Sequence, residues 1–262
     1  MNDTRKPVLE YRDTSLSFGG LKAIQHVSLH VSTGELVGLI GPNGAGKTTL
    51  FNMATGVYCP DEGSIHFCNE DITGRPPHRV NHCGMARTFQ NIRLWGALSV
   101  LDNIRAAMHR SAENSLWRIV VGGTASQALE DEVVHRAHEI LKYMELDRFA
   151  DEQARNLPYG EQRRLEIARA LATDPKLLLL DEPAAGMNTS EKVHLMKLIR
   201  RLQSERHLTI LLIEHDMKVV MGICERVIVL DHGVIIAQGK PEVIQKDPKV
   251  IEAYLGEPLS HN

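Results

Sequence analysis

Two short stretches of the sequence carry residues that could bind and cleave a phosphate anhydride. The first is GPNGAGKTT, residues 41–49, which matches the pattern Gly-x-x-x-x-Gly-Lys-Ser/Thr. Its glycines let backbone N–H groups turn toward phosphate oxygens, and the helix that should follow adds partial positive charge. Lys47 can reach the β- and γ-phosphates, and Thr48 can offer its hydroxyl to Mg²⁺. The expected nucleotide-binding residues of this loop are Gly41, Pro42, Asn43, Gly44, Ala45, Gly46, Lys47, Thr48 and Thr49.

The second stretch is LLLLDEP, residues 177–183, in which four leucines lead directly into two neighbouring carboxylates. Such a short apolar run is typical of a strand buried on both faces, or of a piece of buried helix. Adjacent carboxylates repel each other and are costly to bury, so a cation is expected at this end of the element. If the apolar run at residues 36–40 is a parallel neighbour, Asp181 holds Mg²⁺ beside the phosphates, and Glu182 orients or deprotonates an attacking water.

Each stretch also has a simpler interpretation. Residues 41–49 could be a glycine-rich turn with a surface lysine, and residues 181–182 could be ordinary surface acids at the end of an edge strand. The position of the glycines between an apolar strand and a helical pattern favours a phosphate loop. In open parallel sheets ligands bind beyond the carboxyl ends of the strands, which favours one shared site for both stretches.

The elements that must position these residues predict an α/β fold. Alternating apolar and polar residues predict a half-buried, antiparallel strand that begins near Ile24 and ends in a turn at Gly34. The apolar run at residues 36–40 predicts a buried strand. Beyond Pro183 strands and helices alternate, which implies a parallel sheet covered on both faces. The helices are expected near residues 190–205 and 217–224, and the strands near residues 208–216, 226–231 and 234–239.

The middle of the chain is predicted to be helical. Apolar residues recur at helical spacing from Leu98 to Met108, and a second helix is expected over about residues 125–144. A third helix, at residues 161–172, leads into the four leucines. We therefore predict one domain over residues 1–262, in which a helical subdomain is inserted into a catalytic core that includes the antiparallel strands. The subdomain is expected at residues 95–158, and the core at residues 1–94 and 159–262.

The bulk composition narrows the classes of function. Apolar residues make up 43% and charged residues 24% of the 262 residues, which is ordinary for a globular protein. The formal net charge of −3 gives no basic excess, so nucleic acid is not an expected partner. No apolar run approaches the roughly 18 residues needed to span a bilayer, and the first residues lack the apolar stretch of a signal peptide. The four cysteines form no C-x-x-C pair and suit a reducing compartment.

Further motifs resemble those of the ATP-binding cassette (ABC) ATPases. GTPases fit poorly because the sequence has no N-K-x-D element, and a small-molecule kinase has no need for the second acid, Glu182. Phe18, in LSFGG, stands where the family has an aromatic residue that stacks on adenine, although core packing is an equal alternative. Gln90, in RTFQN, resembles the Q-loop glutamine, which in the family touches Mg²⁺ and the coupling helices of the transporter. His215, in IEHD, resembles the switch histidine that lies at the γ-phosphate.

The stretch NLPYGEQRRLEIARAL resembles the signature motif and its helix. The resemblance implies that this motif faces the ATP of a partner cassette, and the corresponding residues are Leu157, Pro158, Tyr159, Gly160, Glu161 and Gln162. Two positions depart from the family pattern. Pro158 replaces the usual serine, so its hydroxyl contact to the partner's γ-phosphate is lost, and Asn188 replaces the D-loop aspartate. Both departures affect the contacts expected across a cassette dimer.

Other stretches, among them RTFQNIRLWGALSVLDNI, DEPAAGMN and VIEAYLGE, look like the ATPase subunits of bacterial branched-chain amino acid importers. The resemblance implies a RecA-like P-loop core with an antiparallel β part and a helical insertion, ATP and Mg²⁺ as cofactors, and hydrolysis that drives uptake of leucine, isoleucine or valine. It implies catalytic roles for Glu182, His215 and Gln90, and a metal site at Thr48, Gln90 and Asp181.

The resemblance also implies partners. These are a second ATPase, identical or not, in a head-to-tail dimer, two membrane permeases, and indirectly an extracytoplasmic solute-binding protein. The chain would then lie peripherally on the cytoplasmic face of the inner membrane. Another solute, such as urea, a short amide or a lipid, remains an alternative. So does an ABC ATPase outside transport, although such proteins carry a long coiled-coil insertion or two cassettes in one chain, and this sequence has neither.

Overall fold

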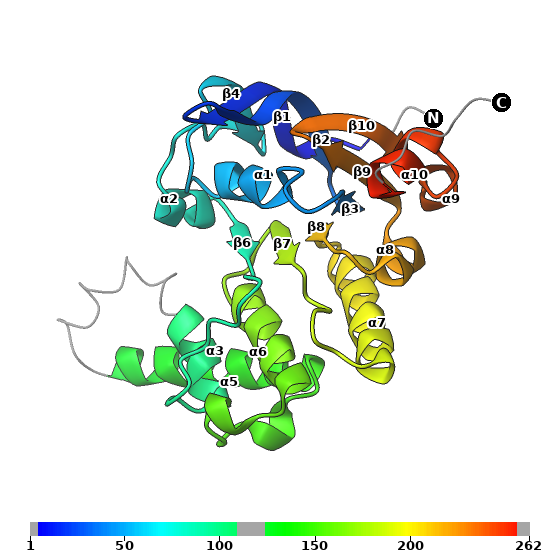
Figure 1. The fold of residues 1–262 in the computed structure, drawn as a ribbon. Coiled ribbons are helices and arrows are strands. Elements are labelled where there is room, and N and C mark those ends of the chain that lie inside the picture. Colours follow the sequence, from blue (N-terminus) through cyan, green and yellow to red (C-terminus); the bar gives the residue numbers. More distant parts are fainter. Residues whose placement is uncertain (1–4, 109–123, 256–262) are drawn as a thin grey trace.

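The computed structural model describes residues 5–108 and 124–255, which form two sheets and several groups of helices. In Figure 1 an antiparallel sheet lies at the top and helix α1 (Lys47–Ala54) lies beneath it. A six-stranded sheet runs from the middle of the view to the upper right, where its edge lies beside the antiparallel sheet. The remaining large helices lie below this second sheet. The order of layers is therefore sheet, helix, sheet and helices, which is an α/β architecture as the sequence predicts.

The six-stranded sheet has the order β10-β9-β3-β8-β7-β6. All neighbouring strands are parallel except the edge pair β9 and β10, which is antiparallel. The direct pairing considered for residues 36–40 and the four leucines does not occur, because β8 lies between their two strands, although all three are parallel. The strands are β3 (Leu36–Ile40), β6 (Met85–Arg87), β7 (Leu177–Asp181), β8 (Thr209–Ile213), β9 (Arg226–Asp231) and β10 (Val234–Gly239).

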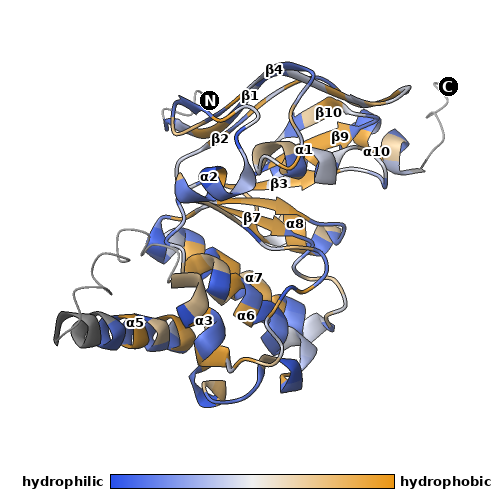
Figure 2. Ribbon diagram, turned by 90° about the vertical axis from the view of Figure 1, so that its left-hand side faces the viewer, coloured by the Kyte–Doolittle hydropathy of each residue, from blue (hydrophilic) through white to orange (hydrophobic). Residues whose placement is uncertain are grey.

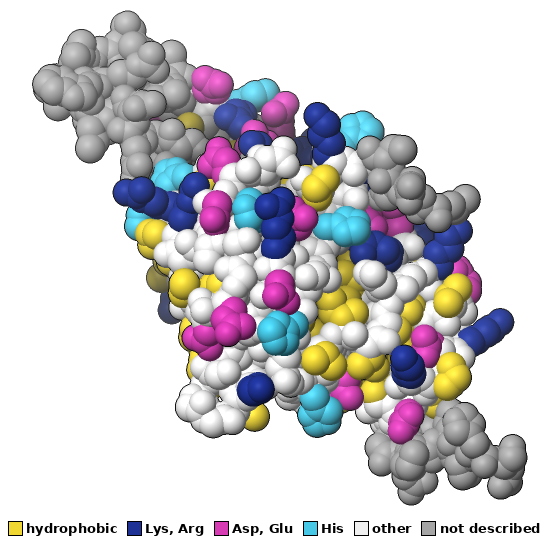
Figure 3. All heavy atoms as spheres, turned by 90° about the horizontal axis from the view of Figure 1, so that it is seen from above, with side chains coloured by type: hydrophobic (Ala, Val, Ile, Leu, Met, Phe, Trp, Pro, Cys, Tyr) yellow, Lys and Arg dark blue, Asp and Glu magenta, His cyan; other side chains and the backbone are white. Residues whose placement is uncertain are grey.

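The antiparallel sheet has the order β2-β1-β4-β5. The strand predicted from alternation is β2, but its long partner β1 is difficult to recognise from the sequence. Register shifts interrupt the pairing of β1, and Asp13 within it has a positive φ of 48°, so the alternation is broken. Figure 3 shows side chains of both charges and histidines interspersed with small apolar areas on the outer face of this region. The strands are β1 (Pro7–Phe18), β2 (Leu21–Ser32), β4 (Glu62–Phe67) and β5 (Glu70–Asp71).

Two apolar cores lie on opposite faces of the six-stranded sheet, and each central strand supplies both. In β7, Leu177 and Leu179 belong to the core under the antiparallel sheet, whereas Leu178 and Leu180 belong to the core that faces the helices. All four leucines have no exposed surface. This explains the continuous apolar run, and the burial of each leucine contributes about 1.5–3 kcal/mol. Figure 2 shows the strands of this sheet as hydrophobic and the helices as mixed.

The helices below the sheet fall into two groups. Helices α7 (Thr189–Arg206) and α8 (Met217–Ile223) follow β7 and β8, while α3 (Val100–Met108), α5 (Thr124–Tyr143) and α6 (Tyr159–Leu171) pack together. One continuous core joins both groups to the sheet. Short helices complete the described part, namely α2 (Pro77–His82), α9 (Pro241–Ile244), α10 (Pro248–Leu255) and 3₁₀ turns at Asp147–Phe149 and Ala154–Asn156. Among the described residues, no helix combines the length and the apolar character needed to cross a bilayer.

Candidate nucleotide-binding and hydrolysis site

The phosphate loop joins the end of β3 to the start of α1, and its glycines sit where the backbone has no room for a side chain. A β-carbon on Gly41, whose φ is 149°, would lie 1.9 Å from the carbonyl oxygen of Leu230. One on Gly46, whose φ is 104°, would lie 2.7 Å from the carbonyl oxygen of Ala23. Gly46 caps α1 and supplies no side-chain hydrogen bond, so the first N–H groups of the helix can serve an anion.

Lys47 is folded into this loop. Its Nζ atom donates to the carbonyl oxygens of Gly41 and Pro42, each at 2.8 Å, and only 6% of the residue is exposed. Burial lowers the pKa of the ammonium group, and the nearby charges of Glu182 and Asp181 oppose that shift. An ammonium group has three N–H donors, so one remains for a phosphate oxygen while two hold the loop.

A cavity of about 670 Å³ opens beside Lys47. Its wall combines the loop with residues from five other parts of the chain, which brings together most of the nucleotide and catalytic residues predicted from the sequence. The predicted residues that line it are Phe18, Asn43, Gly44, Gly46, Lys47, Thr48, Thr49, Gln90, Glu182 and His215. Phe18 is 44% exposed and meets Tyr58 edge to face, with 5.1 Å between ring centroids, so Phe18 is not a core residue.

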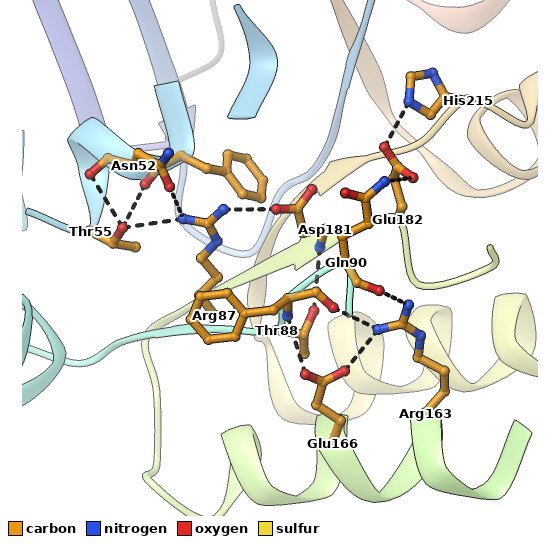
Figure 4. Close-up of polar contacts among 12 residues, drawn as sticks. Asn52, Thr55, Arg87, Thr88, Gln90, Arg163, Glu166, Asp181, Glu182 and His215 are labelled. Atoms are coloured by element: carbon orange, nitrogen blue, oxygen red, sulfur yellow. Dashed lines mark hydrogen bonds and ion pairs between the residues drawn. The ribbon is translucent and has the colours of Figure 1, made fainter. Parts of the chain in front are cut away.

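Three of these side chains converge at the end of the cavity (Figure 4). Glu182 follows β7 directly, and its carboxylate oxygens have different partners. Gln90 Nε2 donates to Oε2 at 2.9 Å, and His215 Nε2 lies 2.7 Å from Oε1. The three residues come from loops after β6, β7 and β8, which are adjacent parallel strands whose carboxyl ends meet at one edge. The cluster therefore holds a carboxylate, a group that can accept a proton, in the same cavity as the phosphate loop.

Glu214 fixes the two loops that carry Glu182 and His215. Its carboxylate is buried and accepts the backbone N–H groups of Ala184 at 2.7 Å and His215 at 3.1 Å. Burial raises the pKa of Glu214, although these hydrogen bonds act in the opposite direction. The side chain thus ties the turn after β7 to the turn after β8.

Asp181 meets a cation that belongs to the protein itself. The residue is 3% exposed, and Arg87 Nη2 donates to its Oδ2 at 2.8 Å. Arg87 Nη1 donates to Asn52 Oδ1 at 2.7 Å and contacts Thr55 (Figure 4). The expected cation at the end of the strand is therefore supplied in part by Arg87, and the charge of Asp181 is already compensated without a metal.

The oxygen donors at and next to the cavity fit Mg²⁺. Thr48 and Gln90 line the cavity, and Asp181 directly precedes the lining residue Glu182. All three offer oxygen ligands of the kind that this hard cation prefers. Over residues 5–108 and 124–255 there is no group of three or more histidine, cysteine or acidic side chains arranged to hold a metal.

The signature stretch, residues 157–162, does not line the cavity beside Lys47. Helix α6 begins at Tyr159, in the middle of this stretch. Pro158 is the N-cap, with φ −54° and ψ 154°, where its missing N–H costs the helix nothing. Tyr159 is 44% exposed, and Gly160 is buried. A β-carbon on Gly160 would lie 3.2 Å from Oε1 of Glu191, so the start of α6 faces the start of α7 in the same chain.

Asn188 is the N-cap of α7. Its side chain accepts the N–H of Glu191 at 3.0 Å, and the Glu191 carboxylate accepts the N–H of Asn188 at 2.8 Å, which completes a capping box. Asparagine and aspartate are equally good N-caps, so the replacement of the family's D-loop aspartate leaves this structural role intact. Glu191 therefore contacts one departure from the family pattern, Asn188, directly, and its carboxylate also lies beside Gly160 of the signature stretch.

Some residues of the site are not predicted from the sequence. Arg87 stands three residues before Gln90, and nothing in the sequence marks its partner. Arg163 and Glu166 form an ion pair three residues apart on α6, a spacing that an ordinary solvated helix face would also show, yet both are buried. Glu214 precedes His215 in IEHD, which is the one signal that could have indicated it.

A family model described as "ABC transporter" matches residues 24–185, which include the phosphate loop, Gln90, the signature stretch and both carboxylates. The chain belongs to the ABC transporter family. A second model, "Branched-chain amino acid ATP-binding cassette transporter", matches residues 234–259. ATP hydrolysis is the general activity of the ABC ATPases, which bind ATP, generally with Mg²⁺.

Individual relatives agree with this assignment. The chain is 44% identical over 252 residues to the high-affinity branched-chain amino acid transport ATP-binding protein BraF of Pseudomonas aeruginosa, covering 96% of this chain and 99% of BraF. It resembles the crystal structure of a nucleotide-free ATP-binding cassette from an ABC transporter, with a TM-score of 0.83, 33% identity, and coverage of 96% and 100%. It also resembles a dimeric bacterial ABC transporter cassette, with a TM-score of 0.74, 26% identity, and coverage of 89% and 98%.

Proposed function

We propose that this chain is the ATP-hydrolysing subunit of an importer for branched-chain amino acids. The observation that carries the catalytic part is the meeting of Gln90, Glu182 and His215 at one end of the cavity that contains Lys47. The identity of 44% to BraF, over nearly the full length of both chains, supports leucine, isoleucine and valine as solutes. The match of residues 234–259 to the branched-chain family model supports the same choice.

In the proposed reaction, the loop N–H groups and Lys47 would bind the phosphates, and Phe18 would stack on adenine. The residues that would hold Mg²⁺ are Thr48, Gln90 and Asp181. Bound Mg²⁺ would neutralise charge on the β- and γ-phosphate oxygens. A water oxygen attacks the γ-phosphorus, the bond to the β–γ bridging oxygen breaks, and Glu182 accepts the proton of the water. Each oxygen of Glu182 accepts one hydrogen bond and keeps a second lone-pair site, so Gln90 and His215 can orient the carboxylate while it works.

The proposed assembly follows from the position of the signature stretch. It lies outside the cavity of its own chain, and so it is available to a second ATPase in a head-to-tail dimer, where the N–H of Gly160 and the start of α6 would meet the partner's γ-phosphate. The likeness to a dimeric cassette supports this arrangement. We also propose that residues 95–108 and 124–158 belong to an inserted helical subdomain; the rest of the predicted range, residues 109–123, lies outside the described residues. We propose further that two permeases bind near Gln90 at the cytoplasmic face of the inner membrane.

Reconstitution tests the proposal. The chain is purified together with the permeases that bind it, placed in liposomes with its solute-binding protein, and assayed for ATPase activity with single solutes. Leucine, isoleucine or valine should stimulate hydrolysis, whereas urea and short amides should not, and Glu182→Gln is the inactive control. Stimulation by urea or an amide alone would contradict the proposed solute. Absence of any co-purifying permease would contradict the role in transport.

A further inference from the structure

A buried ion pair on the signature helix holds the backbone around Gln90. Arg163 and Glu166 lie one turn apart on α6, with 2.9 Å between Arg163 Nη1 and Glu166 Oε2. They are 1% and 2% exposed, so both charges are removed from water. Figure 4 shows their side chains pointing from α6 toward the segment that carries Thr88 and Gln90.

Among the described residues, the hydrogen-bond partners of the pair outside α6 are main-chain groups of residues 89–93. Arg163 donates through Nη1 to the carbonyl oxygen of Phe89 at 2.6 Å, and through Nη2 to the carbonyl oxygen of Gln90. Glu166 Oε1 accepts the N–H groups of Phe89 at 3.3 Å and Arg93 at 3.4 Å. Because the contacts involve the backbone, they fix the path and the orientation of the loop whatever its side chains are.

Stability alone is a weak reason for such a pair. Burying two charges costs several kcal/mol per ion, and well-packed apolar side chains of similar volume are often as stable. The planar fork of a guanidinium group, by contrast, fixes the direction of its acceptors. Here the acceptors include the carbonyl group of Gln90 itself, and the side chain of that residue must place Nε2 within 2.9 Å of Glu182.

We propose that Arg163 and Glu166 are positioning residues, which lock residues 89–93 onto the signature helix so that Gln90 and the signature stretch move as one body. This inference rests on the proposed role of Gln90 in hydrolysis. Arg163 also reaches the exposed signature residue Tyr159, with 3.4 Å between Nη2 and the phenol oxygen. A displacement of α6 at the partner's nucleotide is therefore passed to Gln90 at the chain's own nucleotide.

The test replaces the pair with apolar side chains of similar length, in Arg163→Met/Glu166→Met, and measures the assembled transporter. We expect kcat to fall about ten- to hundredfold, the range for a misplaced hydrogen bond to a charged group. The KM for ATP should change by less than about threefold, because Lys47 and the phosphate loop are untouched. Arg163→Lys keeps the charge but loses the fork, so it should lower kcat as well.

The matched control is Arg226→Met/Glu35→Met, which removes another ion pair whose acid is 2% exposed. That pair joins β9 to the turn before β3, with contacts of 2.7 and 2.9 Å, and lies away from residues 89–93. This control should keep its kcat even where it loses thermal stability. Hydrogen exchange at the amides of Phe89 and Arg93 should accelerate in the α6 variants and remain unchanged in the control.

The outcomes separate this inference from the proposed function. A normal kcat in Arg163→Met/Glu166→Met and Arg163→Lys, together with a low kcat in Gln90→Ala, would overturn the positioning role alone. A normal kcat in Gln90→Ala would overturn the proposed role of Gln90, and with it the proposed coupling through Arg163 and Glu166. If the double variant does not fold, Arg163→Lys decides, because a rise in KM with unchanged kcat in that variant contradicts positioning.

Discussion

Replacing Arg87 with methionine should expose how strongly Asp181 depends on a protein cation. The change removes the guanidinium group 2.8 Å from Asp181 Oδ2 and leaves a carboxylate that is 3% exposed. Removing one partner of a buried ion pair costs about 3–5 kcal/mol of unfolding free energy. For a domain somewhat smaller than this one, each kcal/mol shifts the melting temperature by about 2–4 °C, so Arg87→Met should melt roughly 6–20 °C lower without nucleotide.

A double-mutant cycle separates the ion pair from other effects of the substitution. Arg87 also bonds Asn52 at 2.7 Å and lies over the ring of Phe89, and those contacts are lost in either background. Asp181→Asn removes the charge, so Arg87→Met should cost about 2 kcal/mol less in that background than in the wild type. Melting curves of the four proteins give this coupling free energy. Equal costs in the two backgrounds would refute the argument that Arg87 compensates Asp181.

Magnesium provides a second readout on the same variant. If Asp181 holds Mg²⁺, a bound ion returns the missing positive charge, and ligand binding stabilises the folded state in proportion to RT ln(1 + [L]/Kd). Mg·ATP should therefore raise the melting temperature of Arg87→Met by more than it raises that of the wild type. ATP with a chelator is the control and should give the two proteins similar increases. A smaller response of the variant to Mg·ATP would contradict this account.

Three further predictions concern single residues. Glu182→Gln should bind Mg·ATP, hydrolyse it at least about a hundredfold more slowly, and accumulate as an ATP-bound dimer in size-exclusion chromatography. Near-normal turnover would exclude Glu182 as the general base. Trp95→Ala should reduce co-purification of the permeases and leave ATP affinity and folding intact, because the Trp95 side chain is 47% exposed and its ring packs against Arg169. Loss of folding in this variant would identify Trp95 as a core residue. Burial raises the pKa of Glu214 in the folded protein above 4.5. The free energy of unfolding of the wild type should therefore fall as the pH rises from about 4.5 through that raised pKa. Urea titrations should show no such fall in Glu214→Gln.

The sequence predicts those parts of the site whose functional residues lie close together along the chain. The phosphate loop needs glycines, a lysine and a hydroxyl within nine residues, and the two carboxylates stand next to four leucines. Phe18, Gln90 and His215 could be indicated only through the family pattern, since a lone aromatic, amide or imidazole has many ordinary roles. The structure brings Phe18, Gln90 and His215 to the cavity that Lys47 and Glu182 also line.

Other features depend on contacts between distant residues and could not be predicted. Asp181 and Arg87 are 94 positions apart, and an arginine in a polar stretch ordinarily lies in water. Arg163 and Glu166 have the spacing of a surface pair, and only the fold covers them with residues 89–93. The order of the parallel strands was equally hidden. The apolar runs of β3, β7 and β8 are alike, so nothing in them indicates that β8 separates the other two.

The strand order also determines when the phosphate loop can form during synthesis. Strand β3, which carries the loop, is flanked by β8 and β9, and Gly41 fits against the carbonyl oxygen of Leu230. The loop leaves the ribosome well before these residues. At a synthesis rate of about 5–20 residues per second, roughly 10–40 s pass before they have been added to the chain. Until then β3 has no strand to pair with, and the backbone of Leu230, against which Gly41 packs, is missing. A nascent chain released before β9 is complete should therefore be unable to bind nucleotide and should depend on chaperones to keep β3 from aggregating.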